Sequence, residues 1–144
     1  MPSGQYYIAL VEDSAADAFL VREALEQAGV RAELQILQDG EVAIEFLEAI
    51  ESNEHAPCPN LVILDLNLPL VSGEQVLEHV RRMRKCGSTP VIILTSSESP
   101  RDRDTVIRLG ATEYFRKSSN LDEFMALGFV VRNLLDGKSS EASA

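Results

Sequence analysis

Five side chains in this sequence have the chemical types needed to transfer a phosphoryl group onto a carboxylate. Three carboxylates placed together would repel one another and raise one another's pKa values, and a hard divalent cation such as Mg²⁺ would remove that conflict. A nearby ammonium and a hydroxyl would bind the phosphoryl oxygens while one carboxylate attacks the phosphorus in line. The five residues are Glu12, Asp13, Asp65, Thr95 and Lys117.

Each of these residues alone has an ordinary structural explanation. Asp13 could cap a helix, Thr95 could be a turn hydroxyl, and Lys117 could be a solvated surface lysine. Their joint placement is more informative, because they follow four separate apolar runs and no packing requirement calls for that set. The pattern therefore indicates a shared site rather than unrelated surface residues.

The elements that must position these residues are five short apolar runs that alternate with five amphipathic segments. The middle runs consist almost entirely of Val, Ile and Leu, which is typical of strands buried on both faces of a parallel sheet. We therefore expect a doubly wound α/β domain, with ligands bound beyond the carboxyl ends of its strands. The expected strands are 6–11, 34–37, 61–64, 91–94 and 114–115, and the expected helices are 14–28, 41–51, 74–85, 100–109 and 121–135.

Polar residues mark the starts of three of these helices. Ser14 has an aspartate, Asp17, three residues later, which is a box-like capping pattern. Ser99 precedes a proline at the expected first helical position. Ser119, with Asp122 three residues later, is the expected cap of the last helix.

Length and charge narrow the function classes. The chain has 144 residues and a formal net charge of −10. The length predicts one domain, and the negative charge disfavours nucleic acid as a partner, because phosphate backbones bind clustered basic surfaces.

The sequence also indicates where the protein works. No apolar run is long enough for a membrane span, and the N-terminus lacks the basic and apolar segments of a signal peptide, so we expect a cytoplasmic protein. Cys58 and Cys86 make no disulfide framework, and we expect free thiols.

The residues resemble the receiver domain of two-component response regulators over about residues 6–135. The resemblance implies a flavodoxin-like (βα)5 fold with strand order 2-1-3-4-5, in one domain over residues 1–144 with a short flexible tail at 137–144. It is carried by Val11-Glu12-Asp13, Leu64-Asp65-Leu66-Asn67-Leu68-Pro69 with Gly73, Thr95-Ser96-Ser97, Tyr114 and Lys117.

The resemblance implies a role for each residue that contacts the phosphoryl group. Asp65 would be the phosphoacceptor, Thr95 would hydrogen-bond the phosphoryl group, and Lys117 would form a salt bridge with it. Tyr114 would be an aromatic switch whose ring turns inward when Thr95 moves.

The resemblance also implies a Mg²⁺ site and two tuning positions. Glu12, Asp13 and Asp65 would serve the cation together with the backbone carbonyl of Asn67. Asn67 and Ser97 would modulate how readily water reaches the phosphoryl group.

A narrower resemblance concerns the phosphodonor. The loop at 52–60, the Asp65-Leu-Asn-Leu-Pro segment and the run at 117–122 are similar to the single-domain regulators paired with bacterial phytochrome histidine kinases. We therefore expect a sensor histidine kinase as partner. Few residues follow the last helix, so output is expected through a protein contact or a relay to a histidine phosphotransfer protein.

Ser118 departs from the family pattern. Most receivers have proline after the lysine, with a cis bond between the two residues. A cis bond before a non-proline residue costs about 2.5–4 kcal/mol. We expect either a trans bond with a locally altered loop or a cis bond retained under strain.

The last predicted helix carries more apolar surface than one buried stripe needs. Its flanking stripe could widen the core face or form a partner surface, most simply in a homodimer through the fourth and fifth helices and the fifth strand. The candidate interface residues are Leu127, Val130 and Leu134.

Three other functions fit parts of the pattern. A flavin mononucleotide binder on the same fold needs a Ser/Thr/Gly-rich anion loop where Glu12 and Asp13 stand. An aspartyl phosphatase needs a second acid where Asn67 stands. A receiver-like interaction module that acts without phosphorylation remains the alternative to a phosphorylated, non-enzymatic signalling protein.

Overall fold

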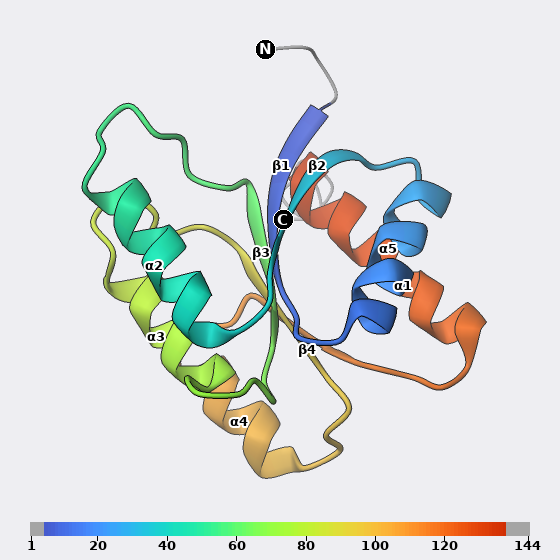
Figure 1. Ribbon diagram of the computed structural model, residues 1–144. Coiled ribbons are helices and arrows are strands. Elements are labelled where there is room, and N and C mark those ends of the chain that lie inside the picture. Colours follow the sequence, from blue (N-terminus) through green and yellow to red (C-terminus); the bar gives the residue numbers. More distant parts are fainter. Residues whose placement is uncertain (1–4, 138–144) are drawn as a thin grey trace.

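The computed structural model describes residues 5–137 (Figure 1). Five parallel strands form one sheet in the order β2-β1-β3-β4-β5, which confirms the predicted fold and strand order. Of the predicted tail at 137–144, residues 138–144 lie outside the described residues. The strands are β1 (Gln5–Val11), β2 (Arg31–Leu37), β3 (Leu61–Asp65), β4 (Val91–Thr95) and β5 (Glu113–Arg116).

Five helices cover the two faces of the sheet. Helices α1 and α5 pack on one face and α2, α3 and α4 on the other, as Figure 1 shows. The helices on each face bury their apolar stripes against the sheet, so the domain has two core layers, one on each side. The helices are α1 (Ala15–Gln27), α2 (Gly40–Glu51), α3 (Gly73–Arg82), α4 (Pro100–Arg108) and α5 (Leu121–Asp136).

The inner strands supply both core layers. In β3, Leu61 and Ile63 pack toward α1 and α5, whereas Val62 and Leu64 pack toward α2 and α3. All five residues of β3 and of β4 are buried. This two-sided burial explains why these strands read as unbroken apolar runs.

The edge strand β2 is longer than predicted. It begins at Arg31, and its residues alternate between exposed and half-buried as far as Ile36. The expected strand at 34–37 omitted Arg31 and Glu33 because their polar side chains interrupt the apolar run. A one-sided edge strand has this alternation, whereas the inner strands do not.

Side-chain caps start the helices, with one correction to the prediction. Ser14 and Ser99 cap α1 and α4 as expected. The cap of α5 is Asn120, whose side chain accepts from the Glu123 N–H, and not Ser119. Asparagine and serine cap about equally well, so the sequence did not distinguish the adjacent positions.

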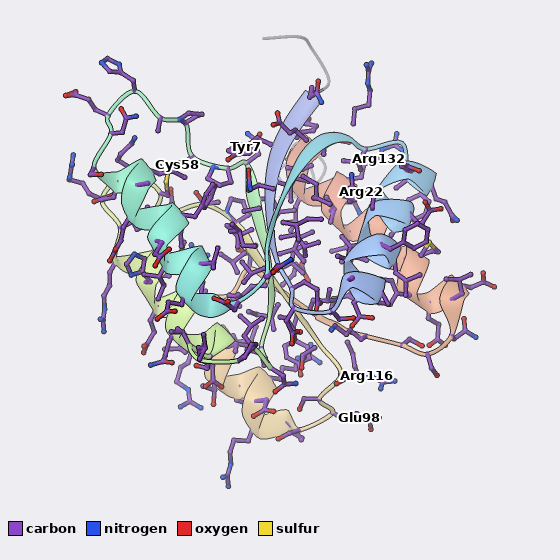
Figure 2. The ribbon with its side chains drawn as sticks, in the orientation of Figure 1. Tyr7, Arg22, Cys58, Glu98, Arg116 and Arg132 are labelled. Atoms are coloured by element: carbon purple, nitrogen blue, oxygen red, sulfur yellow. A yellow bond between two sulfur atoms is a disulfide. The ribbon has the colours of Figure 1, made fainter. Side chains whose placement is uncertain are left out.

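A disulfide joins Cys58 to Cys86, which corrects the expectation of free thiols. The 52–60 loop folds against the α3–β4 connection and brings the two Cα atoms to 5.7 Å. Figure 2 places Cys58 at the opposite end of the sheet from Glu98 and Arg116. Lys85 Nζ fastens the same loop by donating to the carbonyls of Ile50, Asn53 and Ala56.

None of the helices within residues 5–137 combines the length and apolar character needed to cross a membrane.

Candidate functional site

The predicted site residues meet at the carboxyl edge of the sheet. Asp65 and Thr95 are the last residues of β3 and β4. Glu12 directly follows β1, and Lys117 directly follows β5. The backbone N–H of Lys117 donates to the carbonyl of Thr95 at 2.7 Å, which keeps the ends of β4 and β5 level.

Close backbone packing holds the acceptor strand at this edge. Gly73, the first residue of α3, packs against the backbone at the end of β3, and its N–H donates to the Leu66 carbonyl at 3.1 Å. A Cβ at position 73 would collide with the backbone carbonyl of Asp65. Glycine therefore lets the loop that follows Asp65 fold back tightly. The Asn67 N–H donates to Asp65 Oδ1 at 3.1 Å and orients the carboxylate.

Three carboxylates form a cluster at this edge. One ligand oxygen from each of Glu12, Asp13 and Asp65 lies within 4.8 Å of the others. Glu12 and Asp65 are buried, whereas Asp13 is exposed. A cleft of about 420 Å³ beside Glu12 and Asp13, lined also by Phe19 and Arg22, opens the cluster to solvent.

The electrostatics of Glu12 fit a bound cation. Burial and the neighbouring charge of Asp65 raise the pKa of Glu12 to about 7. Its Oε2 accepts from the Ser14 N–H, while its buried Oε1 has no hydrogen-bond partner among the residues that the structure describes. A buried carboxylate oxygen that has only the Lys117 ammonium, at 3.0 Å, as a counter-charge, and that lies next to two further carboxylates, suits a hard divalent cation with oxygen ligands. The Asn67 carbonyl as a fourth ligand stays a prediction.

Lys117 provides the positive charge of the site. Its Nζ lies 2.7 Å from Asp17 Oδ2, 3.0 Å from Glu12 Oε1 and 3.3 Å from Asp65 Oδ2. Burial alone would lower the pKa of Lys117. The hydrogen bond to Asp17 and the charges of Asp65 and Glu12 outweigh burial and raise the pKa above its ordinary value. The side chain is therefore an ammonium throughout the physiological range.

Thr95 connects the acceptor edge to the β4–α4 loop. Its fully buried Oγ1 accepts from the Ser97 N–H at 3.1 Å. The Ser97 hydroxyl donates to Asp102 Oδ2 at 2.7 Å, which ties the loop to the first turn of α4. An exposed ion pair of 2.9 Å between Glu98 and Arg116 then joins this loop to β5 (Figure 2).

A family model described as the response regulator receiver domain matches residues 8–127. The chain belongs to this family. As a receiver domain, it is part of the two-component signalling machinery, in which receivers are paired with sensor histidine kinases.

Similar proteins include phytochrome-associated regulators. The response regulator Rcp1 of Synechocystis sp. is 39% identical over 120 residues, which cover 83% of this chain and 82% of Rcp1. The Mn²⁺-bound form of Rcp1 has a TM-score of 0.78 at 37% identity and covers 89% of this chain and 92% of its own. The phosphorylated cyanobacterial phytochrome response regulator RcpA has a TM-score of 0.80 at 30% identity, over 91% of this chain and 94% of its own.

The loop after Lys117 adopts the first of the two expected alternatives. No peptide bond among residues 5–137 is cis, so the Lys117–Ser118 bond of this receiver domain is trans. The Ser118 hydroxyl donates to Glu123 Oε1 at 2.6 Å and accepts from the Asn120 N–H at 3.0 Å. Ser118 therefore shapes the start of α5 through its side chain.

The proposed interface stripe on α5 is mostly part of the core. Leu127 is fully buried, which corrects its assignment to a surface. Val130 and Leu134 are half-buried and pack against the α1–α5 core layer. The packing of α5 on α1 and the sheet thus covers most of its apolar surface, whereas Leu121 and Phe129 stay exposed. A helical sequence pattern gives the width of an apolar face but not how much of it neighbouring elements cover.

Sequence reasoning missed Asp17 as a site residue. It was predicted as the second half of a capping box, and its N–H does donate to the Ser14 hydroxyl at 3.1 Å. Its carboxylate, however, binds Lys117 from the other end of the chain. The available signal was its place in the first turn of α1, because helical side chains lean toward the N-terminal end of their helix, and α1 starts beside the site.

Proposed function

We propose that this receiver domain accepts a phosphoryl group on Asp65 from the phosphohistidine of a sensor histidine kinase, with Mg²⁺ as its cation. One observation carries the proposal. The buried Asp65 carboxylate lies within a cluster of three carboxylates and 3.3 Å from the half-buried ammonium of Lys117. A binding module that was never phosphorylated would gain nothing from burying this charge.

The transfer follows from the contacts of Asp65. A carboxylate oxygen attacks the phosphorus, a P–O bond forms, and the P–N bond to the histidine breaks. The imidazole nitrogen keeps the electron pair of that bond. The Asn67 N–H holds the orientation of the carboxylate, and the Lys117 ammonium stabilises charge on the phosphoryl oxygens. When bound, the cation supplies charge neutralisation for the carboxylates and the phosphoryl oxygens.

The output follows from the contacts of Thr95. In the unphosphorylated protein its hydroxyl oxygen is engaged by the Ser97 N–H, and Ser97 is joined to Tyr114. A phosphoryl group on Asp65 gives the Thr95 hydroxyl a new acceptor. Movement of Thr95 then changes the surface formed by α4, β5 and α5, and that surface contacts the downstream protein. Asn67 and Ser97 keep their proposed roles as modulators of water access.

The donor that the comparisons favour is a phytochrome-type histidine kinase. RcpA is named a phytochrome response regulator, and the bacteriophytochrome response regulator RtBRR has a TM-score of 0.70 at 33% identity. Several relatives of this kind at 30% identity or more support the same partner class. A stand-alone role, a homodimer and relay to a histidine phosphotransfer protein stay predictions.

Intact-mass spectrometry tests the phosphoacceptor directly. The protein is incubated with a small phosphodonor and Mg²⁺, with and without chelator, beside Asp65→Asn and a variant of an exposed α4 residue, Asp104→Asn. One phosphoryl addition is expected in the wild type and in Asp104→Asn, and none in Asp65→Asn or with chelator. If the wild type takes up no phosphoryl group under conditions that label another receiver, the alternative of an unphosphorylated interaction module replaces this proposal.

A further inference from the structure

The shortest contact of the Lys117 ammonium is with Asp17 and not with the proposed acceptor. Lys117 Nζ lies 2.7 Å from Asp17 Oδ2 and 3.3 Å from Asp65 Oδ2. The contacts with Asp17 and Asp65 both satisfy hydrogen-bond geometry, whereas the 3.0 Å approach of Glu12 Oε1 does not. The ammonium therefore makes its shorter hydrogen bond to α1 and its longer one to the proposed acceptor.

The Asp17 carboxylate is not required to start its helix. The Ser14 hydroxyl accepts from the Asp17 N–H, which caps α1 through the backbone of Asp17. In a complete capping box the residue-17 side chain would accept from the Ser14 N–H, but Glu12 Oε2 takes that N–H at 3.1 Å. The Asp17 carboxylate takes no part in the cap, and its described contact is the hydrogen bond from Lys117.

Asp17 and a phosphoryl group would draw on the same ammonium. The Nζ already lies within 3.3 Å of oxygens from three carboxylates. Phosphorylation makes the charge at Asp65 more negative, at about −1.5 to −2. Asp17 destabilises the phosphorylated state in two ways. It retains part of the hydrogen bonding of Lys117, and its own negative charge repels the phosphoryl oxygens.

We propose that Asp17 is a positioning residue that holds Lys117 in the unphosphorylated protein and competes with the phosphoryl group for it. The inference rests on the proposed function, because it assigns a regulator to the same site. Asp17 thereby weakens the phosphorylated state and sets how completely Lys117 turns toward Asp65. A half-exposed side chain in the first turn of α1 would then tune the receiver without contacting the phosphoryl group.

The probe is beryllofluoride, an anion that mimics the phosphoryl group, titrated at saturating Mg²⁺ and followed by ¹⁹F NMR. Asp17→Asn keeps the size of the side chain and removes its charge. Beryllofluoride is expected to bind Asp17→Asn about two- to fivefold more tightly than the wild type, the range of a partly exposed ion pair. Asp17→Glu restores a carboxylate on the same turn, and binding is expected to return toward the wild-type value.

Asp122→Asn is the matched charge control. Asp122 is an exposed acid in the first turn of α5, and none of the described contacts joins it to Lys117. Its removal is expected to leave beryllofluoride binding unchanged. Equal tightening in Asp122→Asn and Asp17→Asn, or unchanged or weaker binding in Asp17→Asn, overturns the competition. A wild type that binds no beryllofluoride at all overturns the proposed function, which makes the two failures distinguishable.

Discussion

The Tyr114 hydroxyl donates a hydrogen bond to the backbone carbonyl of Ser97 at 3.1 Å and joins β5 to the loop that follows β4. The same loop residue donates its N–H to the Thr95 hydroxyl. The backbone of Ser97 is therefore hydrogen-bonded to both predicted switch residues, through its N–H to Thr95 and through its carbonyl to Tyr114. Ser97 is thus the single residue that connects Thr95 with Tyr114.

Tyr114→Phe should separate phosphoacceptance from output. The variant loses the hydroxyl but keeps the ring that packs against Arg103, whose guanidinium carbon lies 5.6 Å from the ring centroid. We expect an unchanged rate of phosphoryl uptake on Asp65, together with smaller amide shifts in α4 when beryllofluoride binds. Wild-type shifts throughout α4 in the variant would contradict a role for this hydrogen bond in transmission.

The buried Glu12 should make the metal-free protein less stable as the pH rises. Its folded pKa is about 7, against an ordinary value of 4.5, so the folded state binds more protons between these values. The free energy of unfolding should then fall by on the order of 3 kcal/mol from pH 4.5 to pH 7 and level off above it.

Urea unfolding in the presence of chelator, repeated across this pH range, measures the effect. Glu12→Gln keeps the shape of the side chain and should flatten the profile, because the amide does not titrate. The exposed Glu113→Gln is the matched control and should retain the wild-type slope. A profile in Glu12→Gln as steep as in the wild type would assign the pH dependence to other groups.

Arg81 should be a major source of stability away from the site. Its guanidinium donates to the carbonyls of Gly110, Gly87 and Thr89 and so joins α3 to the α3–β4 and α4–β5 connections. Arg81→Ala leaves these carbonyls without their charged donor, and we expect a loss of about 2–4 kcal/mol. Arg81→Lys should recover little, because an ammonium lacks the planar fork of donors.

The neighbouring Arg82 provides the control for Arg81. It is exposed on the same turn of α3, so Arg82→Ala should change the free energy of unfolding by less than about 0.5 kcal/mol. Similar losses in Arg81→Ala and Arg82→Ala would show that the network of Arg81 contributes nothing beyond helix propensity.

The fold could be predicted because its strongest signals are local. Strands β3 and β4 are buried on both faces, so their apolar runs stand out, and the polar residues at their ends mark the site. Asp65, Thr95 and Lys117 were predicted as a group because parallel strands bring their carboxyl ends to one edge.

The features that were missed depend on contacts between distant segments. The Cys58–Cys86 disulfide and the Asp17–Lys117 ion pair join residues that are 28 and 100 positions apart, and no spacing rule connects them. Leu127 was wrongly predicted to lie on the surface for the same reason. Its position around the axis of α5 follows from the sequence, but its burial depends on how closely α1 packs against α5.

The Cys58–Cys86 bond closes a covalent ring that contains β3, Asp65 and the whole of α3. The backbone of the acceptor and of Asn67 is thus enclosed in this ring, while Glu12, Asp13, Thr95 and Lys117 lie outside it. A single protease cut between positions 59 and 85 would open that ring without releasing a fragment. Unfolded chains would also keep β3 and the start of β4 close in space, which lowers the entropy lost when these two strands pair.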